Sequence, residues 1–187
     1  MRATLLLATI ACMEESLRGQ LLIATPSLFD YFRRTVVLVL EHTEEGAMGV
    51  VLNRSSETTV SEAVPVLAAL ADDDELVRLG GPVAPEAVVA LGDFEDPDDA
   101  AATIVGSLGL LDPDAPDPAL RRLRVYAGYA GWGPEQLDGE IESGAWIVEP
   151  AQADDPFRDG DLWSDTLQRK GGGYALMATM PADPSLN

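Results

Sequence analysis

Residues 21–54, LLIATPSLFDYFRRTVVLVLEHTEEGAMGVVLNR, decide the fold of this chain because they hold three apolar runs separated by turn-forming residues. Residues 36–40 and 47–52 are largely β-branched, and the HTEEG between them supplies the glycine and acidic residues that a hairpin connection uses. Leu21–Thr25 is the third run, and it stops at Pro26, which cannot donate a hydrogen bond to a sheet. The runs are continuously apolar, so we expect three strands covered on both faces, with the hairpin central to the sheet.

The composition of the chain is that of one folded domain with a strongly acidic surface. It has 187 residues, of which 47% are hydrophobic and 24% are charged, close to the averages of globular proteins. The 32 acidic and 12 basic residues give a formal net charge of -20. Such a surface repels nucleic acid and anionic membranes, so we expect no direct contact with either. The single cysteine, Cys12, precludes an internal disulfide and favours a cytoplasmic location, and no apolar run has the length of a membrane span.

The first twelve residues are expected to be an extension outside the domain. The start MRATLLLATIACM contains a basic residue, a short apolar stretch and a small residue before Cys12, which are the ingredients of a secretory signal. Translation from Met13 is the simpler interpretation, because MEESLRGQLLIATP then leads into the first strand as a polar segment. We therefore predict an extension over 1–12 and a single domain over 13–187.

Beyond the hairpin, short apolar runs alternate with turn signals and predict both strands and helices. Further strands are predicted over 76–79, 87–91, 103–111, 123–129, 145–148 and 174–180, with solvated acidic loops over 93–100 and 112–118. Helices are predicted from about 59–61 to 71, from Pro134 to 143, and over 162–170. Strands with interspersed helices and no internal repeat indicate an α+β domain with a mixed sheet.

A second distinctive stretch, GYAGWGPEQL at residues 128–137, predicts a loop that runs into a helix. Gly133 can cap this helix and Pro134 can open it, because proline is tolerated in a first helical turn. Leu137 and Ile141 then form the i,i+4 apolar pair of a packed helix face. The opening of the helix also offers backbone N–H groups to an anionic or carbonyl-bearing ligand.

Four stretches together resemble the YqgE/AlgH family of bacterial proteins: residues 21–54, then GGPV, then GYAGWGPEQLDGEI, and finally WIVEP with the later LWSDTL. The resemblance implies a single α+β domain with curled mixed β-sheets flanked by a few helices, a cytoplasmic location and mostly no assigned activity. The AlgH name implies a regulatory role in polysaccharide production. This chain departs from the family pattern at Ser55, where proline is usual, and at Glu135, where glycine is usual.

Five residues are candidates for ligand binding, and each also has a structural interpretation. His42 is suited to acid–base chemistry, ligand contact or a pH switch, or fastens a turn. Asn53 contacts a ligand amide, or takes a turn position at the strand exit because asparagine tolerates left-handed backbone. Trp132 offers a stacking platform or fills the core. Gln136 and Glu140 lie i,i+4 on one helix face, directed into a cleft or into solvent. We predict that all five meet at one cleft, because loops at strand ends converge at a sheet edge.

The sequence favours a regulatory module that binds a small molecule or a protein, and thereby an indirect transcriptional regulator. No motif indicates a metal ion, a cofactor or an oligomeric state. The alternative is an enzyme of unknown reaction that uses His42 with a carboxylate such as Glu41 or Glu140. A modestly charged metabolite is the expected ligand, because Glu135 and Glu140 oppose a highly charged phosphate.

Overall fold

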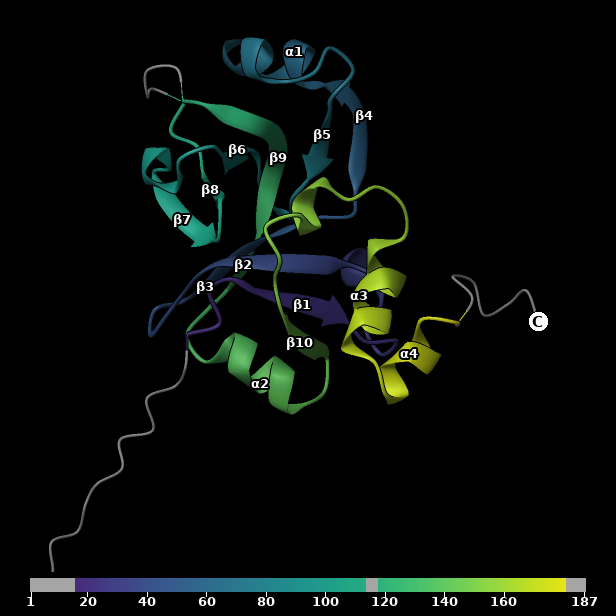
Figure 1. Cartoon of the computed structure of the whole chain (residues 1–187). Coiled ribbons are helices and arrows are strands. Elements are labelled where there is room, and N and C mark those ends of the chain that lie inside the picture. Colours follow the sequence, from purple (N-terminus) through teal and green to yellow (C-terminus); the bar gives the residue numbers. More distant parts are fainter. Residues whose placement is uncertain (1–15, 114–117, 181–187) are drawn as a thin grey trace, which may run out of the picture.

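The computed structural model describes residues 16–113 and 118–180, which form one α+β domain built on a curled 10-stranded sheet (Figure 1). The predicted extension over residues 1–12 lies outside the described residues. The strands are β1 (Gln20–Ala24), β2 (Val36–Thr43), β3 (Gly46–Val51), β4 (Ser55–Thr59), β5 (Leu76–Leu79), β6 (Val83–Phe94), β7 (Ala102–Val105), β8 (Leu108–Leu110), β9 (Leu120–Trp132) and β10 (Trp146–Pro150). The α-helices are α1 (Val60–Ala63), α2 (Gln136–Glu142), α3 (Leu162–Lys170) and α4 (Gly173–Met177).

The sheet has the strand order β10-β1-β2-β3-β9-β6-β8-β7, and β5 joins β4 to β9. The long strand β9 runs through both halves of the molecule: one end pairs with β3 and the rest pairs with β6 and β5 (Figure 1). The β5–β9 pair is parallel and the others are antiparallel, so the sheet is mixed, as predicted. Gly80–Pro82 connects β5 and β6 as a crossover rather than a hairpin, because β9 lies between them. A Cβ atom at Gly81 would collide with the backbone of Tyr129 on β9, so this crossing requires glycine.

The predicted central hairpin is confirmed. Strands β2 and β3 pair in antiparallel register, with β1 on the far side of β2 and β9 on the far side of β3. The side chains of residues 36–40 are at most 2% exposed. The continuously apolar run thus correctly predicted that both faces of β2 are covered.

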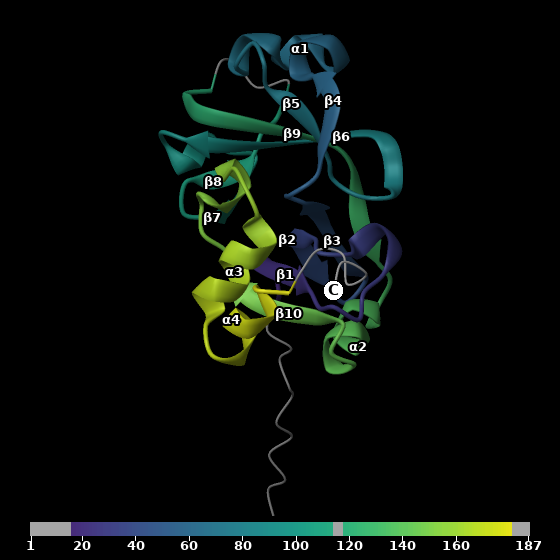
Figure 2. The ribbon, with the colours of Figure 1, turned by 90° about the vertical axis from the view of Figure 1, so that its right-hand side faces the viewer.

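Helices cover the two faces of the lower half of the sheet, which contains β1, β2, β3 and β10 (Figure 2). One hydrophobic cluster packs the sheet against α3, where Trp163 and Leu167 are buried, and a second packs it against α2, where Leu137 is buried. A third cluster fills the upper half, where Val60 of α1 and Leu67 of the 3-10 helix η2 (Pro65–Leu70) lie over β6 and β9.

The helix predicted from 59–61 to 71 is wrong in its extent. The Thr59 capping box forms as expected, with Glu62 at the third helical position, but α1 has only 4 residues. Val64 then adopts φ -136°, outside the helical region, because the ring of Pro65 disfavours helical backbone in the residue before it. The chain continues as a 3-10 helix that starts at Pro65.

Three other predicted segments also differ. The strand over 174–180 is wrong, because 173–177 forms α4; Ala, Leu and Met in this run favour helix, and the run lacks the β-branched residues of the true strands. The strand over 103–111 is instead the β7–β8 hairpin, whose turn uses Gly106 at φ 57°. Asp93 belongs to β6 and is 5% exposed rather than part of a solvated loop.

Helix α2 begins two residues later than the sequence predicts. Its N-cap is Glu135, with left-handed backbone at φ 58°, rather than Gly133. The Gln136 side chain bends back, and its Oε1 accepts a hydrogen bond of 3.0 Å from the N–H of Gly133. The left-handed conformation explains why glycine is the usual residue at this position in the family, since glycine has no Cβ to strain there.

We expect Glu135→Gly to stabilise the chain by about 1 kcal/mol, because relief of left-handed strain exceeds the extra chain entropy of glycine. Thermal unfolding should then shift upward by about 2–4 °C for a domain of this size. Glu142→Gly on the same helix is the matched control and should lower the unfolding temperature, since its backbone is helical. A decrease for both variants would show that Glu135 makes compensating interactions.

Candidate functional site

Glu140 connects α2 to two strands through buried indole groups. Its Oε2 accepts hydrogen bonds from Nε1 of Trp132, at 3.0 Å, and from Nε1 of Trp146, at 2.7 Å. Its Oε1 accepts a hydrogen bond of 2.9 Å from the Gln136 side chain. The two tryptophans are 7% and 4% exposed and belong to β9 and β10. This carboxylate therefore fastens the helix to the sheet with both of its oxygens.

The two indoles belong to a compact aromatic cluster under α2. Their ring centroids lie 6.1 Å apart in an edge-to-face arrangement, and Phe32 contacts both of them. Tyr31 packs edge-on against Phe32 with a centroid separation of 5.3 Å. These contacts fix the orientation of the Trp146 indole, because its N–H and its ring edge both have partners.

The structure thus brings together three of the five predicted site residues, but not as a free cleft. Trp132 and Gln136 each donate a hydrogen bond to the carboxylate of Glu140. Their polar groups satisfy each other, which is the structural interpretation of the GYAGWGPEQL stretch. Whether they also contact a ligand stays a prediction.

His42 lies under the same helix but has other partners. Its Nδ1 accepts a hydrogen bond of 3.1 Å from the N–H of Leu17, and its Nε2 lies 3.5 Å from a carboxylate oxygen of Asp138 on α2. The residues beside it on β2 alternate between faces, which places Glu41 on the opposite side. His42 is therefore paired with neither Glu41 nor Glu140, the two carboxylates considered for an enzyme.

Asn53 lies at the opposite end of the hairpin. Its Oδ1 accepts a hydrogen bond of 3.0 Å from Val36 N–H, and its Nδ2 donates one of 2.8 Å to Arg34 C=O. Arg34 has φ 53°, so Asn53 holds a left-handed turn in place. The prediction that all five residues converge is wrong for Asn53, because His42 and Val36 occupy opposite ends of β2, about 20 Å apart at the rise of a strand.

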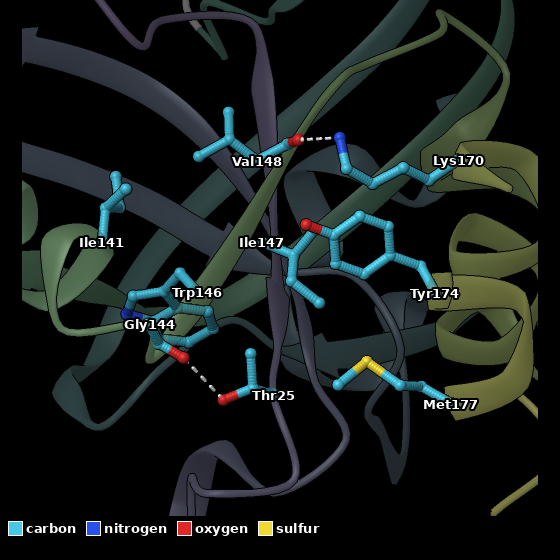
Figure 3. Close-up of a pocket in the computed structure, with 9 residues that line it drawn as sticks. All are labelled: Thr25, Ile141, Gly144, Trp146, Ile147, Val148, Lys170, Tyr174 and Met177. Atoms are coloured by element: carbon cyan, nitrogen blue, oxygen red, sulfur yellow. Dashed lines mark hydrogen bonds between the residues drawn. The ribbon is translucent and has the colours of Figure 1, made fainter. Parts of the chain in front are cut away.

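An open groove with a volume of about 430 Å³ lies beside Trp146. Figure 3 shows that its walls come from α2 on one side and from α3 and α4 on the other, with β10 between them. Its lining residues are Thr25, Ile141, Gly144, Trp146, Ile147, Val148, Lys170, Tyr174 and Met177. Most of them are apolar, and Lys170 carries the only charged side chain of this lining.

Two polar side chains of the groove, Lys170 and Thr25, already have hydrogen-bond partners. Lys170 Nζ donates to the Val148 carbonyl at 2.8 Å and to Glu149 Oε2 at 3.2 Å, and it lies 5.4 Å from the Tyr174 ring centroid (Figure 3). Thr25 Oγ1 donates to the Gly144 carbonyl at 3.0 Å. The ammonium charge is therefore balanced by Glu149, and the groove presents a largely apolar, nearly neutral surface.

The sequence carried one signal for this groove. Proline is tolerated in a sheet only at edges and bulges, so the WIVEP run marks an edge strand through Pro150. The remaining lining residues sit in ordinary amphipathic runs, and Tyr174 was expected in a strand. Their convergence depends on tertiary packing of α2 and α4 around β10, which periodicity does not report.

Two classes of site have no support in the described part of the chain. Within residues 16–113 and 118–180, no group of three or more His, Cys, Asp or Glu side chains is arranged to hold a metal ion. Over the same residues, no helix has both the length and the apolar character needed to cross a membrane.

Comparison with known proteins identifies the family. The family model described as AlgH-like matches residues 21–175. A UPF0301 protein of Streptomyces coelicolor is 44% identical over 188 residues, which cover 92% of this chain and 96% of the relative. A UPF0301 protein of Thermobifida fusca is 43% identical over 193 residues, with the same coverage of 92% and 96%.

Two solved structures share the fold. A crystal structure of a protein from Corynebacterium diphtheriae aligns with a TM-score of 0.78 at 32% identity and covers 87% of this chain and 91% of that one. The solution structure of the AlgH protein from Pseudomonas aeruginosa aligns with a TM-score of 0.67 at 25% identity and covers 97% and 98%. The resemblance seen in the sequence is thereby confirmed, and the chain belongs to the AlgH-like family of UPF0301 proteins.

Proposed function

We propose that this chain is a binding module and that the groove beside β10 is its ligand site. The observation that carries the proposal is the groove itself, an open space of about 430 Å³ whose walls are apolar and whose ammonium group is balanced by Glu149. Ligand sites typically are concave, mostly apolar and already formed before the ligand arrives. Trp146 is held rigidly at the base of the groove by Glu140, so the site is preorganised.

The groove is better suited to binding than to catalysis. Its side chains with reactive groups are Thr25, Lys170 and Tyr174. The hydroxyl of Thr25 is donated to a carbonyl, and the Lys170 ammonium is held by Val148 and Glu149. The hydroxyl and the ammonium are both engaged in hydrogen bonds within the protein, so neither is presented to a ligand as a free nucleophile.

Binding without chemistry supports a regulatory role of the kind that the AlgH name implies. With a net charge of -20, such a regulator would act through a small molecule or a protein partner rather than by contacting DNA. We place it in the cytoplasm, in keeping with its single cysteine. Any effect on transcription would then be indirect.

Methyl NMR tests the proposal, because Met177 lines the groove and Met48 lies elsewhere, on β3. Chains labelled at the methionine methyl groups would be screened against a library of apolar acids, amines and short peptides. We expect binders to shift the Met177 signal and leave that of Met48 in place. A screen without any compound that shifts Met177 contradicts the proposed function.

A matched pair of variants on α4 assigns such binding to the groove. Met177→Trp should fill the groove and abolish binding. Leu176→Trp should leave binding unchanged, because Leu176 is 73% exposed and is not among the lining residues. Equal affinity in both variants would place the ligand elsewhere.

A further inference from the structure

Strand β10 lies at the edge of the sheet, and its backbone has a defined outward face. It pairs with β1 alone among the described strands. Thr25 N–H donates to the Ala145 carbonyl at 3.0 Å, and Ala151 N–H donates to the Gly19 carbonyl at 3.1 Å. Hydrogen bonding in an antiparallel pair alternates along the strand, so residues 145, 147, 149 and 151 face β1. Trp146, Val148 and Pro150 therefore direct their backbone groups toward the groove.

The outward face is partly protected. The Val148 carbonyl already accepts a hydrogen bond from Lys170 Nζ, and Pro150 has no N–H group. Lysine and proline are the residues with which proteins commonly protect sheet edges from other chains. The N–H groups of Trp146 and Val148 are different: no hydrogen bond within the described part of the chain uses either of them. They are two residues apart, which is the spacing at which an added antiparallel strand accepts hydrogen bonds.

The walls of the groove lie on both faces of the sheet at this edge. Trp146 and Val148 belong with Ile141 of α2 to one hydrophobic cluster, whereas Ile147 and Met177 belong to the cluster under α3 and α4. Successive side chains of a strand point to opposite faces. A strand laid beside β10 would therefore place alternate side chains against α2 and against α4, and both surfaces are apolar (Figure 3).

We propose that the edge of β10 binds an extended, apolar segment of a partner protein, which joins the sheet as an additional strand. This inference rests on the proposed function of the groove and names its ligand class. The flanks of the segment are basic, because a chain with a net charge of -20 attracts cations and repels anions. Lys170 acts as a guard: its ammonium must leave the Val148 carbonyl before the incoming N–H can donate to it.

The experiment selects from a random peptide library displayed on phage, with the full chain as bait. Strand addition predicts enriched peptides with alternating apolar residues and flanking lysine or arginine. An enriched peptide would then be synthesised with its backbone nitrogens unchanged, and again with N-methyl groups on the residues that face β10. The methylated version keeps every side chain but cannot donate to the strand, so we expect at least about tenfold weaker binding.

Two substitutions in the chain test the same contact in opposite directions. Val148→Pro removes the outward N–H without breaking a bond to β1 and should weaken the peptide at least about tenfold, whereas Val148→Thr keeps the N–H and should not. Lys170→Met keeps the apolar stem, frees the Val148 carbonyl and should tighten binding. Thermal unfolding checks that all three variants fold; tighter binding by Lys170→Met is a result that damage to the fold would not produce.

The outcomes separate the two proposals. Equal affinity of the methylated and unmethylated peptides, or unchanged affinity for Val148→Pro, overturns strand addition but leaves the groove as an apolar binding site. If the selection enriches no peptide but small molecules shift the NMR signal of Met177, strand addition is likewise overturned and the groove remains an apolar binding site. If neither peptides nor small molecules reach the groove, the proposed function itself fails.

Discussion

Replacing Glu140 with alanine is expected to lower the free energy of unfolding by about 3 kcal/mol, since two buried indole N–H groups lose their acceptor and each such loss costs about 1–3 kcal/mol. The indoles of Trp132 and Trp146 have no other hydrogen-bond acceptor among the described residues. The unfolding temperature should fall by about 6–12 °C. Thermal unfolding followed by near-UV circular dichroism measures both the loss of stability and the altered packing of the indoles.

The matched control is Glu142→Ala, two residues further along α2, where the side chain is exposed. This change should alter stability by at most about 0.5 kcal/mol. If Glu140→Ala resembles the control, the carboxylate is not a structural clamp. In that case Trp132, Gln136 and Glu140 would again be candidates for a separate ligand site.

A loss of similar size is expected for Asp155→Ala. Asp155 is fully buried in η4 (Asp155–Phe157), and its carboxylate accepts two hydrogen bonds from Arg169 of α3, at 2.6 and 3.0 Å, and one of 2.8 Å from the N–H of Gln152. Hydrogen bonds to Asp155 raise the pKa of the Arg169 guanidinium against the opposing effect of burial. The variant loses this partner, but a guanidinium stays protonated in proteins, so the cation remains charged with Glu149, at 4.0 Å, as its one remaining acidic partner among the described residues.

Removing one member of a buried pair typically costs about 3–5 kcal/mol; we expect the lower end, because the Arg169 side chain is 20% exposed. Urea unfolding of the variant measures the loss. Asp154→Ala is the control one residue away: its side chain is 55% exposed, and its ion pair with Arg122 contributes at most about 1 kcal/mol. Equal losses for the two variants would show that burial of Asp155 has no special importance.

The central hairpin was predictable from sequence because its signal is local. Residues 36–40 and 47–52 are apolar, contain several valines and are joined by a short glycine-containing turn, and each of these features favours the same structure. The predictions failed where one residue, or a partner distant in sequence, determines the secondary structure. Pro65 ends α1 because its ring disfavours helical backbone in the residue before it. The run 174–180 is largely apolar, but Thr179 is its only β-branched residue, so apolar character alone was a poor guide to a strand there.

The candidate site was harder to predict because polar residues are ambiguous without their partners. Trp132, Gln136 and Glu140 are close in sequence, and their proximity followed from helix geometry. The third residue that donates to Glu140 is Trp146 from β10, and only the fold shows that it shares the carboxylate. The groove depends on which strand lacks a neighbour, which is a property of the sheet order rather than of any one segment.

The sheet order also determines when each part of the chain can fold during synthesis. Strand β1 precedes every other described strand in the chain, yet it pairs with β10, and β3 pairs with the far end of β9. Strands β4 to β8 find their partners within the stretch that ends at β9, so the upper half can close first. The β2–β3 hairpin consequently stays incompletely covered until α2, β10 and α3 have emerged. Pairing across so long a stretch of chain is slow and leaves apolar strands exposed to aggregation in the meantime. The nascent chain is therefore expected to depend on chaperones until α3 has left the ribosome.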